Sequence, residues 1–168
     1  MKSKTVAVVD YGSGNLRSVS QAVVHVAAGS GLDVLVTSDP QAVFDAERVV
    51  LPGQGAMRDC MRELTDSGLK QAVLEAARSK PLFGVCVGMQ MLFAGSDESP
   101  GVAGLGRFPG MIRWLPDDVK RPQMQWNRLE FRRRDPMFAG LGDAPFVYFV
   151  HSLHGVPDDP DAVAATVE

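Results

Sequence analysis

Residues 81–90 read PLFGVCVGMQ, and this stretch decides the expected fold because it joins a strand to a helix through a sharp turn. The apolar run 81–85 predicts a buried strand, and helical spacing predicts a helix over 88–94. Cys86 stands between them with a glycine two residues to either side. The pattern is the cysteine counterpart of the Gly-x-Ser-x-Gly nucleophile elbow, which occurs in α/β enzymes.

The elbow gives Cys86 a chemical role. A sharp strand-to-helix turn strains the central residue and projects its side chain at the edge of the sheet. Flanking side chains would collide with the neighbouring strand or helix, which accounts for Gly84 and Gly88. The following helix directs its free N–H groups and positive end at the sulfur. The alternative is a buried structural thiol, and the flanking glycines favour the nucleophile.

Strand and helix patterns alternate over the first half of the chain. Apolar, β-branched runs predict strands at 5–10, 32–37 and 48–51, and helical spacing predicts helices at 16–28, 56–67 and 69–79. This alternation predicts a doubly wound, flavodoxin-like α/β fold whose mostly parallel sheet has helices on both faces. Right-handed crossovers then bring the loops that follow the strands to one edge. Three of those loops, 11–15, 52–56 and 84–88, are rich in glycine.

The second half of the chain has a different pattern. After a turn-rich segment, shorter strand-like pieces occur at about 111–115, 128–132 and 146–151, and they predict a small antiparallel extension of the same domain. We therefore expect one domain over residues 1–168. A new strand-like run starts at 162 and the sequence stops at Glu168, so we expect the sequence to be a C-terminally truncated piece of a longer protein.

Composition excludes several classes of function. The net charge of −3 and a single basic run at residues 132–134 do not predict a nucleic-acid-binding face, and the arginine run is interpreted as a solvated edge. No apolar run approaches the roughly 20 residues of a membrane span. The two cysteines, Cys60 and Cys86, match neither a disulfide framework nor a zinc spacing. The expected setting is cytoplasmic and reducing.

The remaining candidates lie in loops and at strand ends. The turn at 52–55 (PGQG) can direct backbone N–H groups at the same crevice, where they would hold an oxyanion. The loop at 10–15 (DYGSGN) lacks the third glycine of a dinucleotide fingerprint, so we expect it beside the substrate or at an interface. His151, at a strand end, is a candidate general base or pocket residue, although a histidine at such a position is more often structural. His25 is expected to be half-buried on a helix, and Cys60 to be a core residue.

Five stretches resemble the class I glutamine amidotransferases, a family built around a Cys-His-Glu triad. They are VDYGSGNLRSV (9–19), LPGQGAMRDCM (51–61), PLFGVCVGMQMLF (81–93), PQMQWNRL (122–129) and YFVHS (148–152). The elbow with Gln90 marks the class. The first and fourth stretches point to the members that serve histidine biosynthesis, and the resemblance covers essentially the whole chain.

The resemblance implies that Cys86 attacks the side-chain amide of glutamine and forms a γ-glutamyl thioester, with no metal or redox cofactor. The implied oxyanion hole and glutamine pocket comprise Gly53, Gln54, Gly55, Val87, Gln90, His151, Ser152 and Leu153. Ammonia would pass to a (β/α)8-barrel cyclase subunit in a heterodimer that makes imidazole glycerol phosphate. Residues assigned to the partner interface or to loops beside it are Tyr11, Gly12, Asn15, Gln123, Trp126 and Asn127.

The sequence departs from the family at three places. The His-Pro-Glu segment that carries the base and its carboxylate is expected beyond Glu168, so neither His151 nor His154 is assigned to the triad. Gln125 stands where the family has glycine, and Leu153-His154 stands where two aromatic residues are more common. Two alternatives stay open: the glutaminase of another amidotransferase of the anthranilate type, and an inactive remnant that binds glutamine or a partner.

Overall fold

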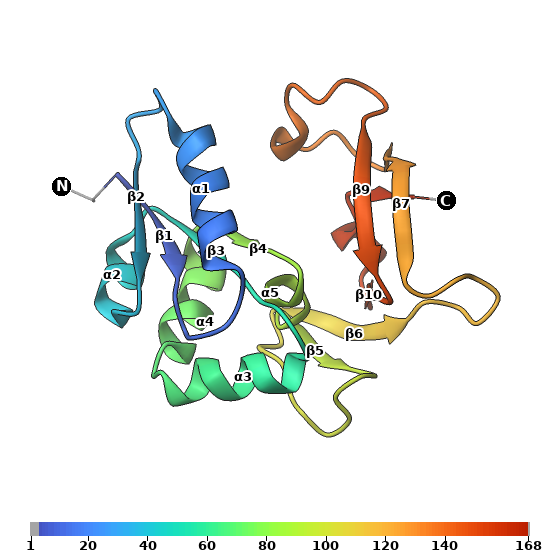
Figure 1. Ribbon diagram of the computed structural model, residues 1–168, viewed down its shortest axis with the longest axis horizontal. Coiled ribbons are helices and arrows are strands. Elements are labelled where there is room, and N and C mark those ends of the chain that lie inside the picture. The colour runs from blue at the N-terminus through green and yellow to red at the C-terminus, as the bar shows by residue number, and fades with distance from the viewer. Residues whose placement is uncertain (1–3, 168) are drawn as a thin grey trace.

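The computed structural model describes residues 4–167, which begin with a four-stranded parallel sheet in the order β2-β1-β3-β4 (Figure 1). Its strands are β1 (Thr5–Val9), β2 (Asp33–Thr37), β3 (Arg48–Leu51) and β4 (Leu82–Gly84). The connecting helices are α1 (Leu16–Ala27), α2 (Pro40–Asp45), α3 (Met57–Asp66) and α4 (Lys70–Ser79). The predicted doubly wound, mostly parallel α/β fold is confirmed.

Alternating side chains of the strands build a core on each face of this sheet. The larger core joins strand residues to buried side chains of α2, α3 and α4, among them Val9, Val49, Leu51, Val43, Leu64 and Val73. The smaller core lies under α1 and comprises Val6, Val8, Val50 and the half-buried Leu16, Val19 and Val23. Burying one such side chain stabilises the fold by roughly 1.5–3 kcal/mol. The two cores therefore hold the carboxyl ends of the strands, and the loops that follow them, in fixed positions.

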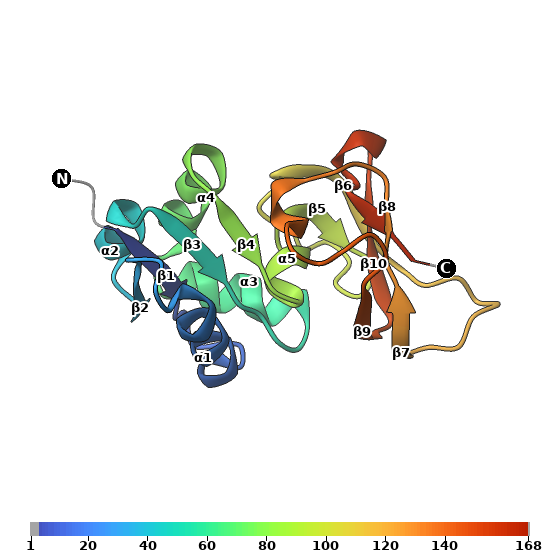
Figure 2. The same cartoon turned by 90° about the horizontal axis from the view of Figure 1, so that it is seen from above.

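The later strands form three smaller sheets. β5 (Phe93–Ser96) pairs in parallel with β6 (Phe108–Trp114), which pairs in antiparallel fashion with β10 (Leu153–Pro157). β7 (Gln123–Arg128) pairs with β9 (Phe146–His151), and β8 (Glu130–Phe131) with β11 (Ala165–Thr166). Short 3-10 turns span Pro136–Phe138 and Pro160–Ala162. Figure 2 shows these strands on one side of the parallel sheet, with the short helix α5 (Val87–Gln90) between the two parts.

Two predicted elements differ from the structure. The helix expected over 88–94 ends at Gln90, because Phe93–Ser96 pairs with β6 as a strand. The strand expected over 128–132 is interrupted, because β7 ends at Arg128 and β8 holds only two residues. The antiparallel extension itself is present. None of the helices within residues 4–167 has the length and hydrophobicity of a membrane span.

Candidate active site

Cys86 occupies a strained turn between β4 and α5. Its φ of 54° is the only positive φ of a non-glycine residue within residues 4–167, and its ψ is −120°. The thiol is free and exposed to solvent. Such backbone conformations cost roughly 1–3 kcal/mol and persist where the surrounding structure enforces them, commonly at functional sites. The predicted elbow is therefore present. The alternative interpretation, in which Cys86 is a thiol buried in the core, is wrong because the residue is exposed.

Three glycines allow the backbone segments around Cys86 to pack directly on one another. A β-carbon on Gly84 would lie 2.6 Å from the Cα of Met89, which belongs to the first turn of α5. On Gly88 it would collide with the carbonyl oxygen of Leu51, and on Gly53 with the backbone nitrogen of Gly88. The turn after β3 is thus pressed against the elbow, as the shared glycine-rich edge predicted.

The turn and the elbow each contribute free backbone donors. Among the described residues, the N–H groups of Gly53, Gln54 and Val87 donate no hydrogen bond. The next N–H in the elbow, that of Gly88, is already bonded to the carbonyl oxygen of Val85 at 2.9 Å. Because α5 has only four residues, these individual N–H groups, rather than a long helix dipole, are available to stabilise negative charge at Cys86.

Gln90 ends α5 close to Cys86, and its backbone N–H bonds to the Cys86 carbonyl oxygen at 3.2 Å. The side chain is only 9% exposed, and its Oε1 has no hydrogen-bond partner among the described residues. A buried amide oxygen without a partner costs roughly 1–3 kcal/mol. The Oε1 of Gln90 is therefore an unused hydrogen-bond acceptor in the elbow.

The loop after β1 supports the turn after β3. The Tyr11 side chain is buried, and its hydroxyl donates to the Pro52 carbonyl oxygen at 2.8 Å. Ser13 Oγ and Cys60 Sγ both lie within hydrogen-bonding distance of the Gln54 carbonyl oxygen, at 3.3 and 3.2 Å. Burial raises the pKa of Tyr11 well above its usual range, and the nearby Cys60 thiol raises it further. The phenol therefore stays protonated and remains a donor.

The other residues expected in this loop have local roles. Asn15 caps α1, since its side-chain oxygen accepts from the Ser18 N–H at 3.2 Å. Gly12 has a φ of 92° and donates its N–H to Asp10 Oδ1 at 3.1 Å. Cys60 is fully buried, as predicted, but its contact with a backbone carbonyl was not expected from the sequence. The sequence offered one indication of this contact, because Cys60 lies in the first helical turn of α3, shortly after the PGQG segment at 52–55.

His151, Ser152 and Leu153 belong to a second group of residues. His151 Nδ1 lies 2.7 Å from the Leu153 carbonyl oxygen, and its Nε2 lies 2.9 Å from Gln123 Oε1. Gln123 in turn donates to Asn127 Oδ1 at 2.9 Å. With both ring nitrogens engaged, His151 has no free nitrogen to accept a proton from Cys86 in this arrangement.

A cavity of about 900 Å³ lies beside this second group, lined in part by His151, His154 and Gln123 but not by Cys86. Burial lowers the pKa of His154, and the neighbouring His151 lowers it further. His25 is exposed on α1, so the expectation that it is half-buried is wrong. The reason is the orientation of α1, whose residues Leu16, Val19 and Val23 face the sheet.

The predicted site residues thus fall into two groups in the structure. One group lies in the turn and the elbow around Cys86, and the other lies around His151. The first set is Gly53, Gln54, Gly55, Val87 and Gln90, in the turn and the elbow. The second set is His151, Ser152 and Leu153, at the end of β9 and the start of β10. Within residues 4–167, no group of three or more His, Cys, Asp or Glu side chains is arranged to hold a metal ion.

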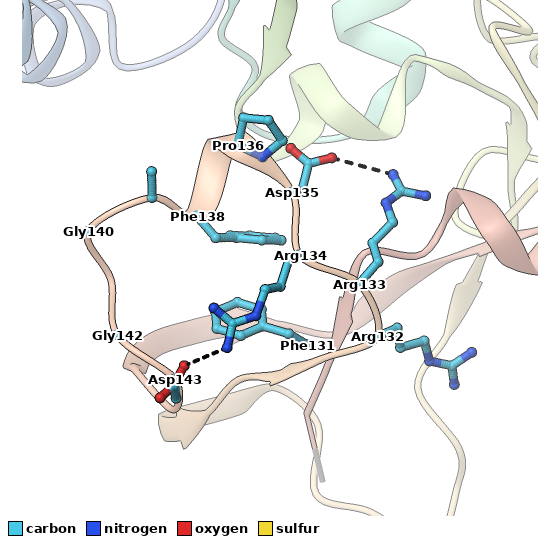
Figure 3. Close-up of a pocket in the computed structure, with 11 residues that line it drawn as sticks. Phe131, Arg132, Arg133, Arg134, Asp135, Pro136, Phe138, Gly140, Gly142 and Asp143 are labelled. Carbon is cyan, nitrogen blue, oxygen red and sulfur yellow. Dashed lines mark hydrogen bonds and ion pairs between the residues drawn. The ribbon is translucent and has the colours of Figure 1, made fainter.

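The arginine run lines a different hollow of about 860 Å³, drawn in Figure 3. Arg133 pairs with Asp135 at 3.7 Å and Arg134 with Asp143 at 3.2 Å, while the Arg132 side chain points away from both pairs (Figure 3). All three arginines are exposed. Exposed pairs of this kind contribute little to stability, so the predicted solvated edge is confirmed.

One face of the β7–β9 ribbon is apolar and exposed. Trp126 is 65% exposed and Tyr148 is 52% exposed, and their ring centroids lie 5.5 Å apart. Met124 and Val150 are paired across the two strands and are also exposed. We call the face made by these four residues the ribbon face. Clustered exposed apolar side chains of this kind mark surfaces that contact other proteins.

Comparison with known proteins identifies the family. The family model described as glutamine amidotransferase class-I matches residues 7–168. Imidazole glycerol phosphate synthase subunit HisH of Chromobacterium violaceum is 50% identical over 161 residues, covering 92% of this chain and 75% of the relative. The HisH subunit of Dechloromonas aromatica is 48% identical over 177 residues, covering 100% of this chain and 80% of the relative.

Solved structures support the same fold. A crystal structure of a glutamine amidotransferase superposes with a TM-score of 0.72 at 17% identity, covering 95% of this chain and 78% of that one. The crystal structure of a putative GMP synthase component from Thermoplasma acidophilum superposes with a TM-score of 0.62 at 16% identity, covering 97% and 72%. The superpositions show the fold, and the matches in sequence show that the chain belongs to the class I glutamine amidotransferases and, within them, to the HisH group.

Proposed function

We propose that this chain is a glutaminase subunit that releases ammonia for imidazole glycerol phosphate synthesis in histidine biosynthesis. The Cys86 sulfur attacks the side-chain carbonyl carbon of glutamine, and the carbon–nitrogen bond of the tetrahedral intermediate breaks. The departing nitrogen takes up the proton lost by the thiol and leaves as ammonia. Water then cleaves the γ-glutamyl thioester, which yields glutamate and restores the thiol.

The observation that carries this proposal is the position of Cys86 beside unbonded backbone donors. The strained φ of 54° exposes the sulfur, and the N–H groups of Gln54 and Val87 lie free in the two segments that pack around it. Donors of this kind stabilise the oxyanion of a tetrahedral intermediate by a few kcal/mol each. Gln90, with its free Oε1, is the candidate for holding the substrate's amino group.

The proposal also needs a base that takes the thiol proton and passes it to the leaving nitrogen. His151 has both ring nitrogens engaged, and the family resemblance assigns this role to a His-Pro-Glu segment expected beyond Glu168. That assignment stays a prediction. It implies that a form ending at Glu168 turns over glutamine orders of magnitude more slowly than a form carrying the segment.

The partner is proposed from the names of the relatives and from the ribbon face. Because the HisH relatives are named as subunits of a synthase, we infer that this chain joins a (β/α)8-barrel cyclase in a cytoplasmic heterodimer. The exposed rings of Trp126 and Tyr148 give this partner an apolar contact surface. The ammonia would reach the cyclase site through the complex.

The test is glutamate release by the full natural chain together with its cyclase partner and the ribonucleotide substrate. The parent should release glutamate, and Cys86→Ala should reduce the rate by at least a thousandfold. A glutamine-like chloroketone should add to Cys86, and peptide mass mapping should find no label on Cys60. Retention of turnover in Cys86→Ala would falsify the proposed mechanism.

The same experiment separates the alternatives. The anthranilate-type alternative is not favoured, because relatives matched over nearly the whole chain carry the HisH name. If a chorismate-using synthase, and not the cyclase, activated glutamate release, the anthranilate-type alternative would be supported. Partner binding without chloroketone labelling would identify an inactive remnant.

A further inference from the structure

Three side chains from two separate elements converge on the backbone of the 52–55 turn. Tyr11 and Ser13 come from the loop after β1, and Cys60 comes from α3. Tyr11 donates to the Pro52 carbonyl oxygen, while Ser13 and Cys60 approach the Gln54 carbonyl oxygen. Ser13 Oγ and Cys60 Sγ also lie 3.5 Å from each other. We call this set of three side chains the turn clamp.

The turn clamp holds alternate carbonyl groups of the turn. The C=O of one residue and the N–H of the next lie in one plane and point in opposite directions across a trans peptide. Holding the Pro52 carbonyl toward the Tyr11 hydroxyl therefore directs the Gly53 N–H away from that hydroxyl. Holding the Gln54 carbonyl fixes the next peptide plane in the same way. The peptide between Gly53 and Gln54, which carries a free N–H, is thus anchored on both sides.

These bonds are specific to the turn. The Tyr11 hydroxyl is buried and stays protonated, so its proton is available for donation to the Pro52 carbonyl oxygen. The two acceptors are the carbonyl oxygens of the turn that faces the elbow, and not those of a helix or strand. A rotation of the peptide group between Gly53 and Gln54 would move the Gln54 N–H away from the position where negative charge develops. Such donors stabilise an oxyanion only within a narrow range of distances and angles.

We propose that Tyr11, Ser13 and Cys60 are positioning residues of the glutaminase reaction, which orient the backbone donors of the 52–55 turn toward the oxyanion formed at Cys86. This inference rests on the proposed function, because it requires that an oxyanion forms at this site. None of the three side chains touches the substrate. They act through the turn, so their loss lowers the rate of acylation and leaves the reactivity of the sulfur toward other reagents intact.

The test compares two reactions of Cys86 in the full natural chain with its cyclase partner. Hydrolysis of glutamine passes through an oxyanion, whereas alkylation by iodoacetamide does not. In Tyr11→Phe, which keeps the ring, we expect the kcat for glutamine to fall about tenfold, with KM and the alkylation rate each within twofold of the parent. Cys60→Ala and Ser13→Ala should lower kcat by severalfold, and Cys60→Ser, which restores a donor, should recover most of it.

Matched controls separate positioning from stability. Ser67→Ala also removes a hydroxyl that donates to a backbone carbonyl, that of Leu64 at 3.1 Å, but it lies at the far end of α3 and should leave kcat unchanged. If Tyr11→Phe fails to fold, Ser13→Ala tests the same clamp from a half-buried hydroxyl. Equal losses of kcat and alkylation would show a merely structural role and overturn the inference.

The outcomes also distinguish this inference from the function on which it rests. If the parent releases glutamate and all three single variants keep kcat within twofold, the turn clamp has no positioning role but the proposed function stands. If the parent with its partner releases no glutamate and is not labelled by the chloroketone, the proposed function fails and the inference fails with it.

Discussion

A β-carbon on Gly88 would collide with the carbonyl oxygen of Leu51, so the first turn of α5 packs directly on the end of β3. The same Leu51 oxygen accepts a hydrogen bond from the Val85 N–H at 2.9 Å. The absent side chain at Gly88 leaves room for this bond, which ties the elbow to the neighbouring strand. The turn that follows Leu51 is thereby placed against the residue that presents the thiol.

Gly88→Ala should therefore destabilise the chain. The β-carbon meets backbone atoms, which cannot move aside as a flexible side chain can, and overpacking of this kind costs roughly 1–3 kcal/mol or more. Urea unfolding followed by circular dichroism measures the loss. Gly95→Ala is the matched control, because its β-carbon would press on the flexible end of the Met111 side chain, with Cε at 3.0 Å, and would meet backbone only at the ordinary contact distance of 3.6 Å, at the Val102 oxygen. Equal losses in the two variants would contradict the packing argument.

Replacing the nucleophile by glycine should separate stability from activity. Cys86 holds a φ of 54°, which glycine adopts without strain and alanine does not. Both Cys86→Gly and Cys86→Ala should abolish glutamate release. Cys86→Gly should nevertheless be more stable than Cys86→Ala by about 1 kcal/mol. Urea unfolding of the two variants measures this difference, and an alanine variant at least as stable as the glycine variant would show that the turn is not strained.

The parallel half of the fold and the elbow could be predicted because their signals are local. The run 48–51 followed by PGQG and the run 81–85 followed by Cys86 each carry a strand and its turn within about ten residues. The strand order then places both turns at one edge. The glycines at 53, 84 and 88 are required by contacts between these same segments, so the sequence pattern and the packing agree.

The antiparallel half could be predicted only in part, because its pairings are distant in sequence. The helical pattern predicted over 88–94 extends into the first two residues of Phe93–Ser96, and this segment becomes a strand through its pairing with β6. The turn clamp could not be predicted from the sequence for the same reason, because Tyr11 and Pro52 are 41 residues apart. No local pattern indicates that a tyrosine in one loop will donate to a carbonyl in another.

The stability of the chain should depend on pH through His154. Burial lowers the pKa of His154 in the folded state, so the unfolded chain binds more protons once the pH falls below the ordinary histidine value of about 6.5. The stability contributed by the neutral side chain is therefore complete above that pH and is lost progressively as the pH falls toward the folded-state pKa. His154→Gln should lose less stability than the parent between pH 7.5 and pH 5.5, measured by urea unfolding. An equally steep loss in the variant would exclude His154 as a source of this dependence.

Partner binding should depend on the ribbon face. Trp126 is 65% exposed and packs beside Tyr148, so Trp126→Ala removes a large apolar surface with little effect on the core. Buried tryptophans at interfaces commonly contribute 2 kcal/mol or more to binding. We therefore expect the affinity for the proposed cyclase partner to fall at least tenfold, measured by isothermal titration calorimetry. The matched control is Phe44→Ala, an exposed aromatic residue on α2, which lies far from β7 and β9 (Figure 1). It should change the affinity less than twofold, and similar losses from both variants would place the interface elsewhere.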